Sequence, residues 1–112
     1  MKKIFLSVVL ASLPMSAFAD YACNTTISAV LVYYDGTINL LHPARGDYTY
    51  VCNLNTPRLG IDTTTCAMWT ALLLAARKNR SNVSIYYPGT GSCATLPVYG
   101  NSPAPTYIGD YN

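Results

Sequence analysis

The chain of 112 residues has no glutamate, no glutamine and one histidine, and only 11% of its residues are charged. General acid–base catalysis usually recruits His, Glu or Asp with a shifted pKa. The single histidine, His42, stands in a loop with no acidic residue closer than Asp47. The sequence also lacks a glycine-rich phosphate loop and a nucleophile elbow. These absences argue against an enzyme, and we expect neither a catalytic residue nor a cofactor.

The charge balance excludes binding by bulk electrostatics. The formal charge is only +2, and Lys2 and Lys3 supply two of the seven basic residues. The other five basic residues are matched by five aspartates. We therefore expect no attraction to nucleic acid or to an anionic membrane surface. A hydrophobic fraction of 51% equally excludes a disordered chain.

Residues 1–19 have the pattern of a secretory signal peptide. Two lysines precede a short apolar run, Pro14 interrupts it, and Ala17-Phe18-Ala19 forms an A-x-A cleavage site. The apolar run is shorter than the roughly 20 residues that a membrane span needs. We therefore expect a bacterial protein, secreted or periplasmic, with a single domain over residues 20–112 and no membrane span.

Four cysteines follow this segment, and an even number in a small exported domain predicts two disulfides. Their wide spacing does not suit a zinc site, which uses close cysteine pairs, so we expect no metal. Three pairings are open. We favour Cys52–Cys66, which would tie the end of a strand to the start of the following helix, together with Cys23–Cys93.

The remaining sequence predicts strands around one helix. Asp35-Gly36 is typical of a type I′ hairpin turn, and Pro97 confines any strand that contains it to an edge or bulge. The expected strands cover residues 26–34, 37–41, 47–54, 83–87, 94–99 and, in the tail, 106–112. The order β-β-β-α-β-β, with most strands antiparallel, is that of a five-stranded OB-fold barrel.

The expected helix covers residues 66–76, after several N-cap candidates between Asp62 and Thr65. It is apolar on every side and carries no charge before Arg77. One small sheet cannot cover both sides of it, so its second side either meets another subunit or stays exposed as a mostly alanine surface. We expect Arg77, Lys78 and Arg80 to complement the helix dipole, and Asn79 to end the helix in the left-handed conformation.

Ten tyrosines are the conspicuous candidates for binding. Tyr33-Tyr34 and Tyr86-Tyr87 are adjacent pairs on expected strands, so one ring of each pair should face inward and the other outward. Outward rings beside hydroxyl and amide groups suit sugar binding. A protein interface is a second explanation for the many tyrosines, because interfaces are rich in this residue. A third is structural, since tyrosine favours strands and fills the core.

Four features together resemble one family. They are Ser28-Ala29-Val30-Leu31-Val32, Tyr50-Val51-Cys52, a cysteine (Cys66) entering a helix that contains tryptophan, and Ile85-Tyr86-Tyr87-Pro88-Gly89. In this order and spacing they are similar to the B subunits of bacterial AB-type toxins, most of all the subtilase cytotoxin B-subunit group. The resemblance runs from about Ser28 to Tyr87.

The resemblance implies an OB-fold, a pentameric ring with helices lining a central pore, binding of sialylated cell-surface glycans, and a toxic A subunit as a partner. In that family a serine at the start of the first strand and the second tyrosine of the pair contact sialic acid. Ser28 and Tyr87 match them. An aspartate four residues before the serine is replaced here by Asn24, which can hydrogen-bond only as a neutral group.

We therefore expect a non-catalytic, glycan-binding protein that forms a ring. The main alternative is a small exported structural or interaction protein of the same fold without lectin activity. A secreted hydrolase or an enzyme inhibitor is a third class.

The first prediction concerns export and oxidation. The exported protein should begin at Asp20 and contain no free thiol, because the A-x-A site and the even cysteine count imply cleavage and two disulfides. N-terminal sequencing and alkylation of the folded, unreduced protein measure both. A cysteine that is alkylated without reduction would contradict the two-disulfide framework.

Overall fold

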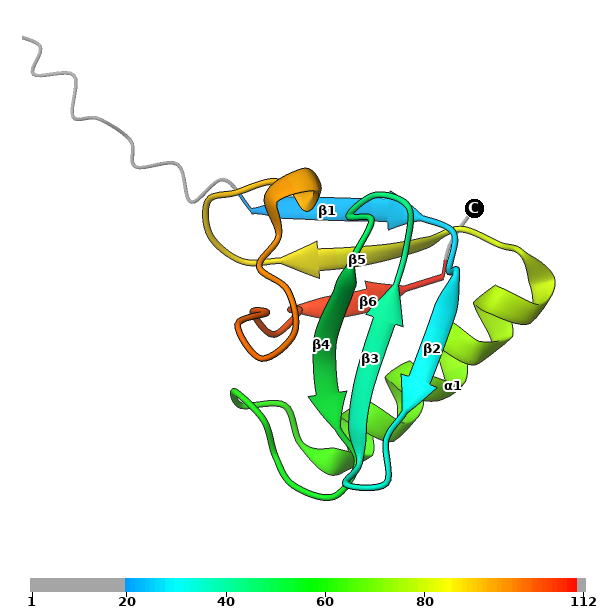
Figure 1. Cartoon of the computed structure of the whole chain (residues 1–112), viewed down its shortest axis with the longest axis vertical. Helices are drawn as coiled ribbons and strands as arrows, with labels where there is room; N and C mark the ends of the chain where they lie inside the picture. The colour runs from blue at the N-terminus through cyan, green and yellow to red at the C-terminus, as the bar shows by residue number, and fades with distance from the viewer. Residues whose placement is uncertain (1–19, 111–112) are drawn as a thin grey trace, which may run out of the picture.

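The computed structural model describes residues 20–110 as two three-stranded antiparallel sheets and one long helix (Figure 1). The first sheet has the order β1-β5-β6, from β1 (Tyr21–Thr25), β5 (Val83–Tyr87) and β6 (Tyr107–Gly109). The second has the order β2-β3-β4, from β2 (Ala29–Val32), β3 (Thr37–Leu41) and β4 (Tyr48–Asn53). The expectation of a mainly β domain with one helix is confirmed, but two separate sheets stand where one five-stranded barrel was expected.

The first expected strand, residues 26–34, is wrong as a single element. Its first residues, Thr26–Ser28, form a bend, and only β2 lies within it, paired with β3. The preceding strand β1, which was not expected, pairs with β5. Ile27, only 7% exposed, turns into the core at the bend, and the Ser28 backbone N–H donates to the Leu41 carbonyl. The strands β1 and β2 run in clearly different directions (Figure 1).

A hairpin joins β2 to β3 at the expected place but with a different turn. The Gly36 N–H donates to the Tyr33 carbonyl, so Tyr34 and Asp35 occupy the turn centre and Gly36 follows at φ 89°. A type I′ turn needs positive φ at both central residues, and Asp35 does not have it. A Cβ at Gly36 would lie 2.7 Å from Asn53 Oδ1, so this position requires glycine.

The helix α1 (Thr63–Asn79) is longer than predicted at both ends. Asp62 is its N-cap, and its carboxylate accepts a 2.7 Å hydrogen bond from the Thr65 N–H. Arg80 rather than Asn79 adopts the left-handed conformation after the last turn. One side of the helix is buried, through Cys66, Trp69, Thr70, Leu73 and Ala76. The opposite side is apolar and exposed, through Ala67, Met68, Ala71, Leu74 and Ala75.

Both predicted disulfides are confirmed. Cys52–Cys66 joins the end of β4 to the first turns of α1, with 5.6 Å between the Cα atoms. Closing a loop of this length stabilises the fold by roughly 3 kcal/mol through chain entropy. Cys23–Cys93 joins β1 to η1 (Cys93–Thr95), a short 3₁₀ turn.

The segment after β5 differs from the predicted strand over residues 94–99. It forms η1 and then an irregular connection, and Tyr99 alone makes a parallel bridge, to Thr49 of β4. Pro97 lacks the N–H that a regular strand would need here. In the tail, only β6 forms. Residues 111–112 of the predicted closing strand and the signal peptide at 1–19 lie outside the described residues. Within residues 20–110, no helix combines the length and the apolar character needed to cross a membrane.

His42 is buried, although the sequence places it in a loop. It is 0% exposed, and neither ring nitrogen has a hydrogen-bond partner among the described residues. Burial, and secondly the positive charge of Arg45, lower the pKa of His42 to about 4. The imidazole is therefore neutral in the folded protein at neutral pH.

The second prediction concerns acid. Because the pKa of His42 is about 4 when folded and about 6.5 when unfolded, protons favour the unfolded chain. The stability from neutral His42 is complete above pH ~6.5 and is lost as the pH falls toward 4, about 3 kcal/mol in all. Urea unfolding between these pH values measures it. The variant His42→Leu should lose this slope, and a slope equal to that of the parent would contradict the assignment.

Candidate functional site

Tyr87 is a core residue in the structure. Its side chain is 1% exposed and its ring stacks on Tyr21, with 5.4 Å between the ring centroids. Burial raises the pKa of its phenol. The ring therefore cannot stack on a sugar from outside, contrary to the expected role. Tyr86 is the outward member of this pair, and its hydroxyl donates to Asp20 Oδ2 at 2.9 Å.

The three expected ligand residues do not meet. Tyr87 lies opposite Tyr21 at one end of the β1–β5 ladder. Asn24 lies three residues further along β1, opposite Ser84, and Ser28 follows beyond the bend at the other end. Asn24 and Ser28 are both exposed. Ser28 is thus separated from Tyr87 by the length of the ladder.

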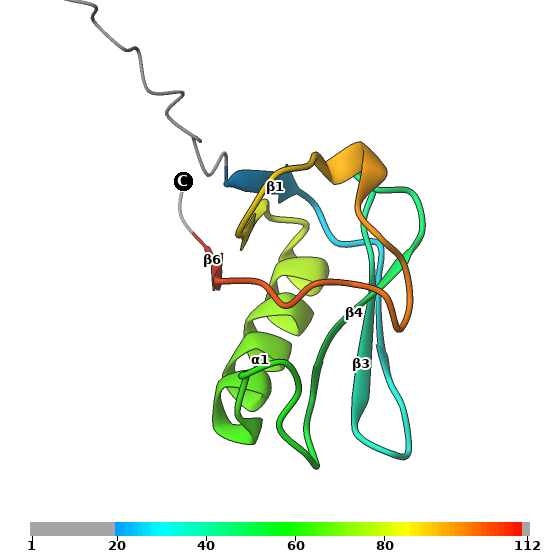
Figure 2. The same cartoon turned by 90° about the vertical axis from the view of Figure 1, so that its left-hand side faces the viewer.

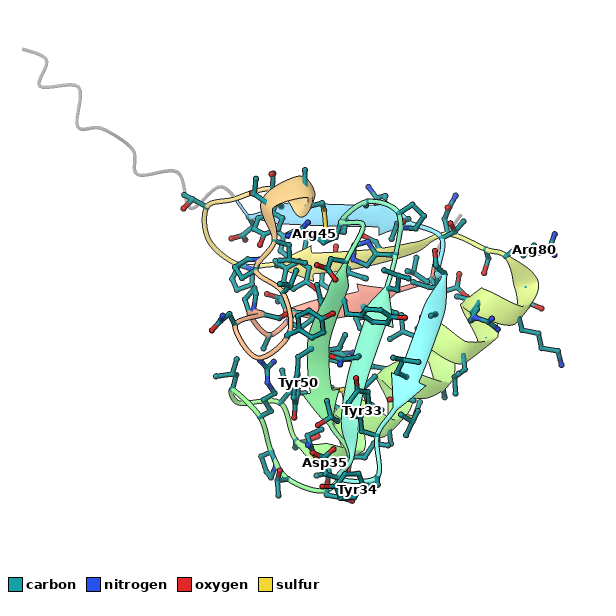
Figure 3. All side chains as sticks on the ribbon, in the orientation of Figure 1. Tyr33, Tyr34, Asp35, Arg45, Tyr50 and Arg80 are labelled. Atoms are coloured by element: carbon teal, nitrogen blue, oxygen red, sulfur yellow. A yellow bond between two sulfur atoms is a disulfide. The ribbon has the colours of Figure 1, made fainter. Side chains whose placement is uncertain are left out.

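Ser28 lies instead in an open notch between the β1–β2 bend and the C-terminal end of α1. The notch has a volume of about 440 Å³ and is lined by Ile27, Ser28, Arg77, Lys78 and Arg80. Three of these five residues are cations, and no carboxylate lines the notch. Figure 3 shows Arg80 at this end of the molecule.

The backbone fixes two of the cations at the notch. The Arg77 guanidinium donates through Nε to the Ser28 carbonyl at 3.2 Å, which links the helix to the bend. Arg80 has φ 53°, and its N–H donates to the carbonyls of Ala76 and Arg77 at the end of the helix. The carbonyl ends of a helix favour cations, so the position of these side chains agrees with the dipole.

The notch suits a ligand that carries a negative charge. Arginine binds carboxylates through paired N–H groups, and a serine hydroxyl both donates and accepts. Charges near the surface attract an anion only moderately, since solvent and salt screen them. The arrangement therefore fits a weakly bound, carboxylate-bearing molecule with further hydroxyl groups.

Ser28 was predicted from the sequence as a ligand residue, but its neighbours in the notch were not. Arg77, Lys78 and Arg80 were interpreted only as complements to the helix dipole. Three cations within four residues, directly after a helix segment without charge, were the signal available in the sequence. The direction of the helix relative to Ser28 could not be read from the sequence.

Comparison with known proteins adds no family. No protein-family model matches the chain, and neither a curated protein nor a solved structure matches it.

The third prediction separates the two neighbouring tyrosines. Tyr87→Ala should lower the free energy of unfolding by about 3–5 kcal/mol, because it leaves a cavity in the core. Tyr86→Ala, the same substitution one residue earlier, should cost clearly less, since the Tyr86 ring is only partly buried. Chemical denaturation of both variants measures the difference. Equal losses would contradict the inward position of Tyr87.

Proposed function

We propose that this chain is a secreted or periplasmic, non-catalytic glycan-binding subunit of the kind found in bacterial AB-type toxins. Its ligand is an acidic saccharide of the sialic acid type. The observation that carries the proposal is the notch at Ser28, where three cations and a hydroxyl meet and no carboxylate intervenes.

Each group in the notch has a role toward such a sugar. Arg77 uses Nε for the Ser28 carbonyl, and its two terminal nitrogens remain for the sugar carboxylate. Lys78 and Arg80 add positive charge. The hydroxyl of Ser28 bonds a sugar hydroxyl or the carboxylate. Tyr87 is buried and does not contact the sugar in this proposal, and Asn24 lies outside the notch lining.

The element order supports an OB-type domain. When β1 and β2 are counted as one strand bent at Ser28, the order is β-β-β-α-β-β, as in that fold. Two disulfides without free cysteines among the described residues suit an exported domain of this size.

Sheet edges that pair on one side and an exposed apolar helix face support a ring. The edge of β4 is covered, because Tyr99 donates its N–H to the Tyr48 carbonyl and the Tyr50 N–H donates to Ser102 Oγ. Among the described residues, β1, β2 and β6 each pair with another strand on one side only. β2 and β6 belong to different sheets, so a contact between β2 of one copy and β6 of the next is head-to-tail, and such contacts form a ring when the rotation between copies closes. A pentamer is the expected size, from the resemblance.

Several sites on one ring compensate for weak binding at each. A single shallow site of this kind should bind near the millimolar range, about 4 kcal/mol. Attachment to several glycans on one surface then raises the overall affinity without new contacts.

The fourth prediction tests the notch with two variants. Ser28→Ala and Arg80→Gly should each weaken binding to immobilised sialylated oligosaccharides, by a factor of about five for the loss of one hydrogen bond or charge contact. Arg80→Gly also relieves the left-handed backbone at φ 53°, so it should raise the free energy of unfolding by several tenths of a kcal/mol.

Arg80→Gly separates binding from folding, because it should weaken glycan binding and raise the free energy of unfolding. Surface plasmon resonance and thermal unfolding measure the two effects. A parent protein that binds no sialoglycan, or an Arg80→Gly variant that binds as well as the parent, would refute the acidic-glycan site and favour the interaction-protein alternative.

The fifth prediction tests assembly. Leu74 is 46% exposed on the apolar side of α1. Leu74→Lys should dissociate the ring, since an unpaired charge in an interface is costly. The same substitution at Leu59, a loop residue that is 65% exposed, is the control and should leave the ring intact. Sedimentation velocity reads the size, and a monomeric parent at tens of micromolar would contradict the ring.

A further inference from the structure

The outer face of the second sheet carries a cluster of tyrosine and amide side chains. Ile38 and Leu40 of β3 point into the core, so Asn39 between them points to the other face. Its Cα partner on β4 is Tyr50. Tyr33 lies beyond the end of β2, beside β3, where its N–H donates to the Thr37 carbonyl. Figure 3 shows Tyr33 and Tyr50 on the side of this sheet that faces away from α1.

Asn39 is the unusual member of this face. It is 4% exposed, although it points away from the core. Its Nδ2 donates to the Tyr33 hydroxyl at 3.1 Å, while its Oδ1 has no hydrogen-bond partner among the described residues. A buried acceptor without a donor costs free energy, and a ligand that supplies the donor recovers it.

The two phenols beside Asn39 are held as donors. The Tyr33 hydroxyl accepts from Asn39, and the Tyr50 hydroxyl accepts from Asn53 Nδ2 at 2.9 Å and from Thr37 Oγ1 at 3.4 Å. Each phenol therefore keeps its own proton for a further acceptor. The face thus offers two donors and one acceptor within a few side chains.

The cation beside Tyr50, Arg58, is already engaged. The Arg58 guanidinium lies 3.9 Å above the Tyr50 ring and donates to the carbonyls of Tyr50 and Ser102 at 3.0 and 2.8 Å. It fixes the Tyr50 ring from one side and satisfies its own hydrogen bonds within the chain. An anion would therefore gain little from Arg58, and it would also face the lone pairs of Asn39 Oδ1.

We propose that this face is a second binding site, for a neutral pyranose ring. A sugar hydroxyl donates to Asn39 Oδ1, and neighbouring hydroxyls accept from the phenols of Tyr33 and Tyr50. The Tyr33 ring, 43% exposed, covers an apolar face of the sugar. Asn39 Oδ1 is buried, so the Tyr33 side chain shifts to admit the sugar hydroxyl and exchanges its hydrogen bond with Asn39 Nδ2 for contacts with the sugar.

The site is separate from the notch at Ser28. Tyr33 and Tyr50 lie toward the hairpin end of the second sheet, whereas Arg80 lies at the opposite side of the molecule (Figure 3). The notch is lined by cations and selects acidic groups, while this face selects uncharged hydroxyls. The two sites therefore fail or succeed independently.

Titration of the ¹⁵N-labelled protein with neutral methyl glycosides tests this proposal. The probes are the methyl glycosides of galactose, glucose, mannose and N-acetylglucosamine, each up to about 100 mM, well above a millimolar Kd. At least one should shift the amide signals of Leu31, Tyr33, Asn39 and Tyr50 and leave those of the notch in place. Tyr33→Ala should weaken that binding by about tenfold or more, and Tyr33→Phe by a smaller factor through the lost hydroxyl.

Tyr34→Ala is the matched control, because Tyr34 is the neighbouring residue and 99% exposed. It should bind the neutral glycoside as the parent does. Ser28→Ala, which changes the notch, should also bind the neutral glycoside as the parent does. The proposal is overturned if no neutral glycoside shifts this face, if the shifts fall only at the notch, or if Tyr34→Ala weakens binding as much as Tyr33→Ala. Binding of sialylated glycans that depends on Arg80 would survive any of these results.

Discussion

The Cys52–Cys66 disulfide determines where the helix can lie, and the position of the helix determines the notch. It fixes the first turns of α1 to the end of β4. The 17 residues of the helix form a rod of roughly 25 Å. Its far end therefore reaches the bend between β1 and β2, where the Arg77 guanidinium bonds to the Ser28 carbonyl. Figure 2 shows the helix lying beside the sheet that contains β3 and β4, along one of its faces.

The same geometry divides the charges of the chain. Arg77, Lys78 and Arg80 come together because all three stand at the end of one fixed helix. Asp35 and Asp62, in contrast, hold backbone N–H groups at a turn and at the helix start, which lowers the pKa of each carboxyl. A chain that is nearly neutral after residue 19 thereby presents one cationic notch, and the rest of its candidate surfaces are aromatic or apolar.

Local features of the sequence predicted the local features of the fold. The Asp62 cap, the helix and the hairpin at Gly36 follow from short patterns that act within a few residues. The disulfide pairing followed from the order of strand and helix. The bend at Thr26–Ser28 and the strand β1 before it were missed because a β-rich run at 26–34 does not show that the chain changes direction at its start to pair with a second sheet. The type of turn was missed because Asp-Gly also occurs where only the glycine has positive φ.

The candidate site was only partly predictable for the same reason. Alternation along β5 predicted that Tyr86 and Tyr87 face opposite ways but not which one faces the core. Tyr33 and Tyr34 are both exposed, since they lie at the end of the hairpin and not within a paired strand. Ser28 was found through the family resemblance, whereas its cationic neighbours depend on the direction of α1. Asn39 gave no signal in the sequence, because its unpartnered oxygen exists only in the folded sheet.

The measurement that tests the account most directly compares the α-methyl glycoside of N-acetylneuraminic acid with its methyl ester. The two ligands differ by one methyl group, which removes the negative charge of the carboxyl group. In ¹⁵N spectra of the folded protein, the acid should shift the signals of Ile27, Ser28, Arg77, Lys78 and Arg80, and the ester should shift them far less. Equal shifts with both ligands, or no shift at these residues with the acid, would contradict recognition of a carboxylate at the notch.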